Sequence, residues 1–176
     1  MRLLQILQRA EFSNNMSVIE INDTSLRIED VLEKDGVYPT VTSGTSMRPL
    51  FKTHRDMLIL ERVSGTLKKY DVALYRIGDK YILHRVIGVD KEKKVYIIRG
   101  DNTFTKEYVR FDSVLARLTV FKRNGKHHTV NDRSYIVYSV LWNFIYPIRY
   151  LINLGVRAVR KIYRIIFRSN KSDKKI

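Results

Sequence analysis

The sequence predicts a mainly β protein: a small antiparallel sheet or barrel, preceded by one short helix and followed by an amphipathic helical tail. Three observations predict this fold class. From residue 37, short runs alternate apolar and polar positions and are rich in β-branched and aromatic residues. Turn residues such as Ser64-Gly65 and Asn124-Gly125 separate these runs, without helical segments between them. From residue 136, apolar residues recur with a helical period instead.

The composition fits one domain with a tail. The chain has 176 residues, of which 44% are hydrophobic, and this is enough for one packed core. We therefore divide it into an N-terminal extension with a short helix (1–36), a β-rich domain (37–135) and a basic amphipathic tail (136–176).

The elements follow in order along the chain. A short helix is predicted over 25–36, with Ser25 as a capping residue and Gly36 as its stop. Residues 1–9 contain no apolar run long enough for a signal peptide or a membrane span, and we assign them no function. Strands are predicted at 37–42, 57–61, 72–75, 80–89, 95–99 and 114–122.

The charge of the chain indicates which class of partner it binds. Its net charge of +15 would attract an anionic partner, either a nucleic acid or a membrane surface. Residues 143–176 hold nine basic residues and one acidic residue. The chain has no cysteine, which excludes a disulfide scaffold, a thiolate nucleophile and a thiolate zinc site.

The tail predicts two helices that meet at Pro147, the second of them amphipathic. On a helical wheel one stripe is basic, and it contains Arg157, Arg160, Lys161, Arg164 and Arg168. The opposite side is apolar, with Ile148, Leu151, Ile152, Val159, Ile162, Tyr163 and Ile166. This pattern favours attachment to an anionic membrane surface. Packing on the β domain and a membrane span over 136–155 are the alternatives. No recognition motif for nucleic acid accompanies the charge, so we expect no nucleic-acid partner. Since the sequence predicts neither a signal peptide nor a convincing membrane span, we expect a peripheral membrane or cytoplasmic location.

Ser46 is the candidate nucleophile, in the segment Ser43-Gly44-Thr45-Ser46-Met47-Arg48-Pro49. A strand ends there, Gly44 permits a tight turn, and Pro49 suits the first turn of a short helix. A serine in such a turn presents its hydroxyl beside backbone N–H groups that could hold an oxyanion. The same residues also suit an ordinary loop, in which Ser43 is a second hydroxyl.

Two later segments could complete the chemistry. His84 lies in Tyr81-Ile-Leu-His84-Arg85-Val-Ile-Gly88, on a predicted strand whose inward face it shares with Ile82 and Val86. Taken alone, it also fits a core histidine that bonds a neighbouring carbonyl. Likewise, Arg99-Gly100-Asp101-Asn102 is by itself a common turn.

In this order, the three segments resemble the type I signal peptidase family, which shares its superfamily with the LexA-like self-cleaving repressors. The resemblance rests on Gly-x-Ser-Met-x-Pro, His-Arg-Val-Ile and Gly-Asp-Asn, and it covers residues 37–118. It implies a serine endopeptidase with Ser46 as nucleophile and His84 as base, as in the branch that uses His in place of Lys. We expect the two side chains within hydrogen-bond reach, or slightly farther apart without substrate.

The orienting acid is left open between two residues. Asp101 matches the family's Gly-Asp-Asn and is the first candidate, while Glu107 stands where the His-type branch has a further Asp. Asp71 resembles another family segment, although Tyr70 replaces the expected glycine, and we expect it to be structural.

The resemblance implies that an extended leader or signal segment of a peptide or exported protein is the substrate. The alternatives are a non-catalytic peptide-binding descendant and a LexA-like regulator, which would need a DNA-binding domain and a scissile Ala-Gly or Cys-Gly pair that this sequence lacks. We expect no cofactor and no metal, and we place His127-His128 in a solvated loop.

Overall fold

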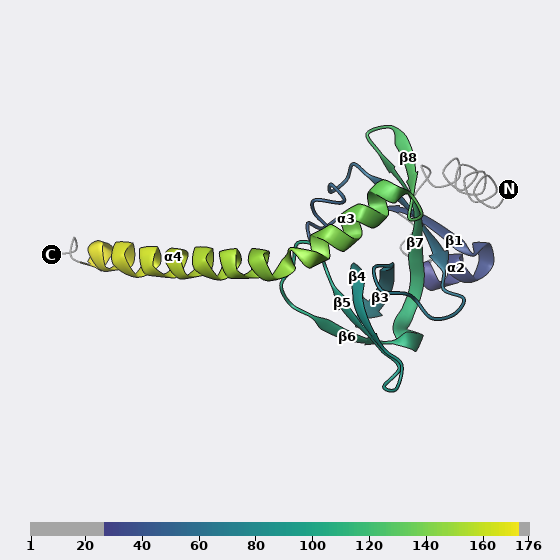
Figure 1. Cartoon of the computed structure of the whole chain (residues 1–176), viewed down its shortest axis with the longest axis horizontal. Helices are drawn as coiled ribbons and strands as arrows, with labels where there is room; N and C mark the ends of the chain where they lie inside the picture. The colour runs from purple at the N-terminus through teal and green to yellow at the C-terminus, as the bar shows by residue number, and fades with distance from the viewer. Residues whose placement is uncertain (1–26, 173–176) are drawn as a thin grey trace. The chain divides into compact units, whose positions relative to one another are not determined.

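The computed structural model describes residues 27–172, with the side chains of residues 27–164. In this part of the chain, eight strands form one antiparallel sheet, and helices stand before and after it (Figure 1). The strands are β1 (Val37–Val41), β2 (Met57–Arg62), β3 (Val72–Ile77), β4 (Lys80–Asp90), β5 (Val95–Arg99), β6 (Glu107–Arg110), β7 (Val114–Arg123) and β8 (Lys126–Thr129). The helices are α2 (Ile28–Asp35), α3 (Arg133–Phe144) and α4 (Tyr146–Ser172). The mainly β prediction is therefore confirmed.

The order of the strands brings distant segments together. It runs β1-β2-β7-β3-β4-β5-β6, and β8 pairs with β7. The long β7 thus lies between β2 and β3, although β4, β5 and β6 separate it in sequence from β3. In the register of β4, His84 lies opposite Ala73 of β3, and Arg85 lies opposite Arg99 of β5. Since successive side chains of a strand alternate, His84 and Arg85 point to opposite faces of the sheet.

Two strands escaped the sequence prediction. β6 has only four residues, and β8 consists of Lys126, two histidines and Thr129, so neither shows an apolar alternation. Asn124 and Gly125 have φ values of 50° and 76°, the left-handed pair that closes a two-residue hairpin between β7 and β8. His127 and His128 consequently lie on a strand, and the prediction of a solvated loop is wrong.

The helix boundaries also differ from those predicted. α2 begins at Ile28, and the predicted cap Ser25 lies outside the described residues. Gly36 ends this helix with a φ of 72°, which a residue without a Cβ adopts readily. After the sheet there are two helices as predicted, and Pro147 falls in the first turn of α4, where its missing N–H costs no hydrogen bond.

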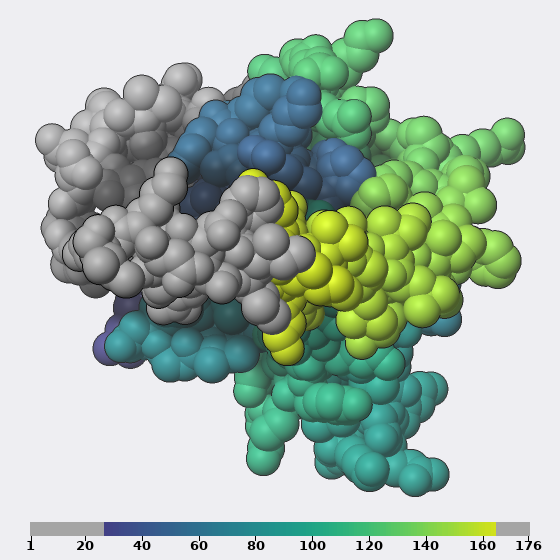
Figure 2. Space-filling model, turned by 90° about the vertical axis from the view of Figure 1, so that its left-hand side faces the viewer, coloured from purple at the N-terminus to yellow at the C-terminus, as the bar shows by residue number. Residues whose placement is uncertain are grey.

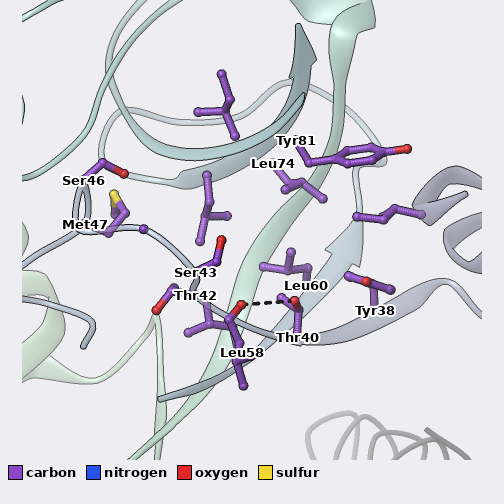
Figure 3. A pocket seen from close by; sticks show the side chains of 15 residues that line it. Tyr38, Thr40, Thr42, Ser43, Ser46, Met47, Leu58, Leu60, Leu74 and Tyr81 are labelled. Atoms are coloured by element: carbon purple, nitrogen blue, oxygen red, sulfur yellow. Dashed lines mark hydrogen bonds between the residues drawn. The ribbon is translucent and has the colours of Figure 1, made fainter. Parts of the chain in front are cut away.

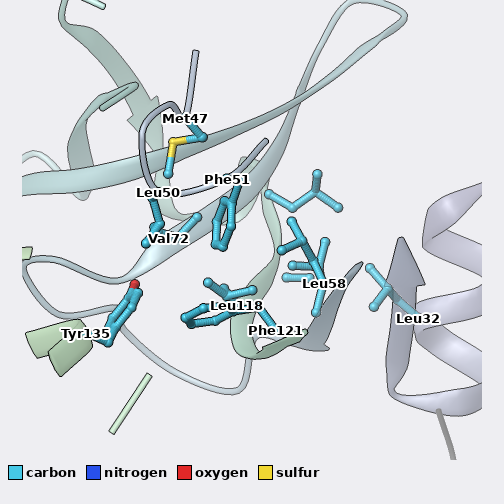
Figure 4. Close-up of a cluster of buried hydrophobic side chains, with 12 residues drawn as sticks. Leu32, Met47, Leu50, Phe51, Leu58, Val72, Leu118, Phe121 and Tyr135 are labelled. Carbon is cyan, nitrogen blue, oxygen red and sulfur yellow. The ribbon is translucent and has the colours of Figure 1, made fainter. Parts of the chain in front are cut away.

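The core consists of two clusters of buried side chains. One cluster contains Met47, Leu50 and Phe51, which come from the connection between β1 and β2 and pack against sheet residues such as Leu58 and Phe121 (Figure 4). The other surrounds Tyr75, Val86, Tyr96 and Ile98. The first cluster matters for function because it anchors the segment that carries Ser46.

By its contacts the chain separates into two units, the first ending at Ser139 and the second beginning at Val140. The second unit contains the end of α3 and the 27-residue α4. Among the described helices, none combines the length and the apolar character that crossing a bilayer requires.

Candidate active site

Ser46 lies in a turn that its neighbours hold in place. The segment forms successive turns, closed by Arg48 N–H to Thr45 O (3.2 Å) and Phe51 N–H to Met47 O (3.1 Å), and not the short helix that the sequence suggests. Met47, directly after Ser46, is 3% exposed. Burial of that side chain, with Leu50 and Phe51, fixes the backbone of the turn while Ser46 stays half-exposed.

The Gly-Asp-Asn turn is bonded directly to this segment. Asn102 donates its backbone N–H to Ser46 O at 2.7 Å, and its side-chain amide donates to Thr45 O at 3.3 Å. In the described part of the chain, no backbone hydrogen bond is donated by the N–H of Ser46 or of Met47. These N–H groups are candidate donors to an oxyanion.

His84 is buried on β4, and two side chains contact its Nδ1 atom. Glu107 Oε1 lies 3.2 Å from Nδ1, and Tyr75 Oη lies 3.1 Å from it. Tyr75 in turn donates its hydroxyl proton to Glu107 Oε2 at 2.5 Å. β3, β4 and β6 thus each supply one member of a closed triangle of His84, Tyr75 and Glu107.

This triangle determines which ring nitrogen carries the proton. An ionised carboxylate only accepts hydrogen bonds, and the single proton of Tyr75 is already donated to it. Both neighbours of Nδ1 are therefore acceptors, so Nδ1 must be the donor. In the neutral imidazole, Nε2 is then unprotonated and is available as a base.

Gly100 brings the nucleophile segment and the imidazole together. A Cβ atom at Gly100 would lie 2.8 Å from Ser46 O, 3.0 Å from His84 Nε2 and 3.0 Å from its Cδ2, too close for any side chain. Both residues therefore contact the same backbone position, and glycine is required there. Ser46 Oγ and His84 Nε2 are nonetheless not hydrogen-bonded to each other in the described residues. Catalytic pairs are often longer before substrate binds.

The surroundings of His84 favour its neutral form. Burial lowers the pKa of His84 below its ordinary value, and the negative charges of Glu107 and Asp101 only partly oppose this effect. Burial, together with the hydrogen bond to Glu107, raises the pKa of Tyr75, which therefore keeps its proton. An imidazole that is neutral near neutral pH can accept a proton from a hydroxyl.

Asp101, the first candidate for the orienting acid, instead binds Arg85. Its two carboxylate oxygens accept from Arg85 Nε at 2.7 Å and Nη2 at 2.8 Å, and Tyr138 donates to it at 3.1 Å. Arg85 Nη1 donates further to Tyr70 O, Tyr135 Oη and Ser139 Oγ. The structure therefore places Glu107, and not Asp101, against the imidazole. Asp71 closes the turn before β3 by accepting from Lys68 N–H at 2.8 Å.

A groove of about 400 Å³ leads to Ser46. Figure 3 shows Ser43 and Ser46 toward one end, Tyr38 and Tyr81 toward the other, and Leu58, Leu60 and Leu74 between them. Its walls come from β1 and from residues Tyr81, Ile82 and Leu83 of β4. Within the described strands, β1 is an edge of the sheet, since it pairs only with β2. An edge strand beside an apolar groove can accept an extended peptide as an additional strand.

The described residues contain no group of three His, Asp or Glu side chains that could hold a metal ion. His128 stacks on Phe121, at 5.2 Å between ring centroids, and its Nδ1 lies 3.6 Å from Asp132 Oδ2. This histidine is thus part of the packing of β8.

Sequence reasoning missed Tyr75. Its residue type suits any buried strand, and only the register of β3 against β4 places it beside His84. The sequence carries no local signal for it. Tyr75 and Ala73 share one face of β3, but only the register shows that Ala73 is the cross-strand partner of His84.

Neither a scan against models of protein families nor a search of curated proteins gives a match to this chain.

Proposed function

We propose that this chain is a serine endopeptidase of the signal peptidase kind, with Ser46 as nucleophile and His84 as general base. The observation that carries the proposal is the closed triangle at His84 Nδ1, which leaves Nε2 as an acceptor beside the Gly100 turn that also contacts Ser46. The ordered motifs around Ser46, His84 and Asp101 support it.

The reaction follows from these positions. Ser46 Oγ attacks the carbonyl carbon of the scissile peptide bond and gives its proton to His84 Nε2. The carbonyl oxygen becomes an oxyanion, which the N–H groups of Ser46 and Met47 could stabilise. When the C–N bond breaks, His84 returns the proton to the leaving amine and an ester on Ser46 remains. Water, deprotonated by His84, then hydrolyses the ester and restores Ser46.

Glu107 is the orienting acid in this proposal. Its carboxylate accepts from Nδ1–H and stabilises the imidazolium that forms when His84 takes the proton. Because Tyr75 holds the other carboxylate oxygen, Glu107 has one fixed orientation, although its side chain is longer than the Asp usual in this kind of site.

The substrate that we propose is an extended segment, such as the leader or signal segment of a peptide or exported protein. It would pair with the free edge of β1 and place alternate side chains in the groove that ends at Ser46. We further propose that the enzyme works in the cytoplasm or peripherally on a membrane, and the amphipathic helix α4 favours the second location.

A non-catalytic peptide-binding protein is the second candidate function. The same groove and the same edge strand favour it, since both would bind a peptide whether or not Ser46 reacts. The two functions differ in one observable, the appearance of cleavage products.

The test is incubation with a library of unstructured peptides, with mass spectrometry of the products. Ser46→Ala should abolish cleavage while leaving thermal unfolding unchanged, because a half-exposed loop serine contributes little to stability. Ser43→Ala is the matched control: it removes a hydroxyl from the same groove and should retain activity. Equal cleavage by Ser46→Ala would overturn the proposal. Peptide binding by the wild type without any cleavage would establish the second candidate instead.

A further inference from the structure

We propose that helix α4 is a docking element for the anionic headgroups of a lipid bilayer, with its apolar side in the interface and its basic side toward the headgroups. This inference rests on the peripheral location proposed above and is independent of catalysis by Ser46. It assigns the attachment to one helix face and to one lipid chemistry.

The apolar side of α4 is exposed along its described length. Ile148, Leu151, Ile152, Val159 and Ile162 are between 57% and 66% exposed. At about 100° per residue these five side chains fall on one side of the helix. Figure 2 looks toward the C-terminal end of α4, whose described residues are coloured light green to yellow. An aliphatic stripe of this length in water is unfavourable, and its burial would stabilise a complex.

The opposite side of the helix is basic. Arg157, Arg160, Lys161 and Arg164 form a stripe about 100° wide, and all four are exposed. No acidic residue occurs anywhere between Arg133 and Arg164. The side chains of Ile166 and Arg168, which continue the two predicted stripes, lie outside the described ones. A helix with an apolar stripe and a basic stripe binds best where both are satisfied at once, at an anionic membrane interface.

Aromatic side chains mark the start of this helix. The guanidinium of Arg149 lies 3.8 Å from the ring centroid of Trp142, and the rings of Tyr146 and Tyr150 are 6.0 Å apart. Trp and Tyr are favoured at the level of lipid headgroups, where one end of the ring is apolar and the other is hydrated. An arginine stacked on Trp142 adds a cation at the same level.

Other occupants fit less well. A second copy of α4 would cover the aliphatic stripe but would leave both basic stripes in water, with no acidic residue on the helix to bind them. A nucleic acid would bind the basic stripe but would leave the aliphatic stripe in water. An anionic bilayer is the partner that satisfies both stripes.

Co-sedimentation with vesicles tests this inference. The full chain should bind vesicles of mixed phosphatidylcholine and phosphatidylglycerol, and it should bind vesicles of phosphatidylcholine alone much more weakly. Added salt should weaken the binding, since surface charges act over a Debye length of about 8 Å at physiological ionic strength. Ser46→Ala should bind equally well, so failure of the peptidase proposal would leave this result intact.

Two variants and one control locate the site. Arg157→Glu, Arg160→Glu, Lys161→Glu and Arg164→Glu together should reduce partitioning by at least about 10³-fold, because each basic residue at the surface is worth about 1 kcal/mol. Ile152→Ser with Val159→Ser should reduce it by about tenfold per residue, as expected for lost apolar burial. The control replaces four exposed lysines of the unit that ends at Ser139 with glutamate, and so changes the net charge equally. These lysines are Lys68, Lys80, Lys91 and Lys93. This control should bind almost as the wild type does.

Four results would overturn the inference. One is the absence of vesicle binding, and another is equal binding to neutral vesicles that survives high salt, which would mean hydrophobic insertion without lipid selectivity. If the lysine-reversal control left the vesicles as fully as the α4 reversal variant does, net charge alone would explain the binding. Tighter binding to nucleic acid than to vesicles, unaffected by the Ile152 and Val159 changes, would assign the basic stripe to that partner.

Discussion

Two neighbouring residues of β4 each meet a carboxylate, and the two pairs have different surroundings. On one face of the strand, Arg85 and Asp101 are dry, with side chains 0% and 2% exposed, and the guanidinium donates two parallel hydrogen bonds. On the other face, His84 is 8% exposed, but its partner Glu107 is 27% exposed and shares the contact with Tyr75. The guanidinium keeps its proton, whereas the imidazole can gain or lose one. The difference teaches that the fully buried pair fixes the geometry, while the pair with the more exposed carboxylate contains a group that can exchange a proton.

The two pairs also engage different parts of the chain. Arg85 joins β4 to the Gly-Asp-Asn turn, to Tyr70 and to the first turns of α3, through Tyr135 and Ser139. Within residues 27–172, the side chain of His84 is joined to β3 through Tyr75 and to β6 through Glu107. Because the Gly-Asp-Asn turn is bonded to Ser46 O, the Arg85 pair holds the position of Ser46 without touching it.

Removal of the base should give the largest effect. His84→Ala is expected to lower kcat/KM by on the order of 10³-fold or more, because it removes the group that takes the Ser46 proton. Peptide cleavage measures this, and His54→Ala, at an exposed histidine, is the control. If His84→Ala kept most of the activity, the titratable pair would have no catalytic meaning.

Removal of the buried cation should act on stability. Arg85→Ala removes the counter-charge of the buried Asp101 carboxylate, which is expected to cost about 3–5 kcal/mol in the free energy of unfolding. Urea unfolding followed by circular dichroism checks it. Arg110→Ala, which breaks the exposed Arg110–Asp112 pair, should leave that free energy nearly unchanged. Similar losses in both variants would show that burial does not distinguish these pairs.

Neutralising each acid separates the two roles. Glu107→Gln should lower kcat/KM by about 10²-fold with little change in stability, because an amide can donate to Nδ1 and favour the wrong tautomer. Asp101→Asn should instead lower the free energy of unfolding by about 1–3 kcal/mol, since the buried guanidinium loses its counter-charge. Activity and unfolding measured on both variants decide the matter. The reverse pattern would restore Asp101 as the orienting acid.

The smallest effect is expected at Tyr75 and appears in the pH profile. Burial lowers the pKa of His84, so its imidazole becomes neutral at a lower pH than an ordinary histidine does. The acid limb of kcat/KM should therefore lie below about pH 6.5. Tyr75→Phe removes the proton that Tyr75 donates to Glu107, so the carboxylate attracts the imidazolium more strongly. The pKa of His84 should rise, the limb should move to higher pH, and the rate should fall by about tenfold or less. An unmoved limb would leave Tyr75 a packing residue.

Much of this protein could be predicted from the sequence, for local physical reasons. Alternating β-branched and aromatic residues predicted the strands. Glycines, which adopt a positive φ without a steric penalty, marked the end of α2 at Gly36 and the hairpin turn at Gly125. Ser46, His84 and Asp101 stood out because their types and order suggest a reaction. The two stripes of α4 also follow from spacing alone, since a helical period is a property of neighbouring residues.

Only the tertiary structure placed Glu107, and not Asp101, beside His84 and brought Tyr75 to the same cluster. Each of these decisions depends on the register between strands, and a shift of one residue would turn every side chain to the other face. Register is set by the packing of both faces of the sheet at once, so no single segment encodes it. For the same reason, β6 and β8 could not be predicted as strands from their own residues, because pairing with neighbouring strands makes them extended.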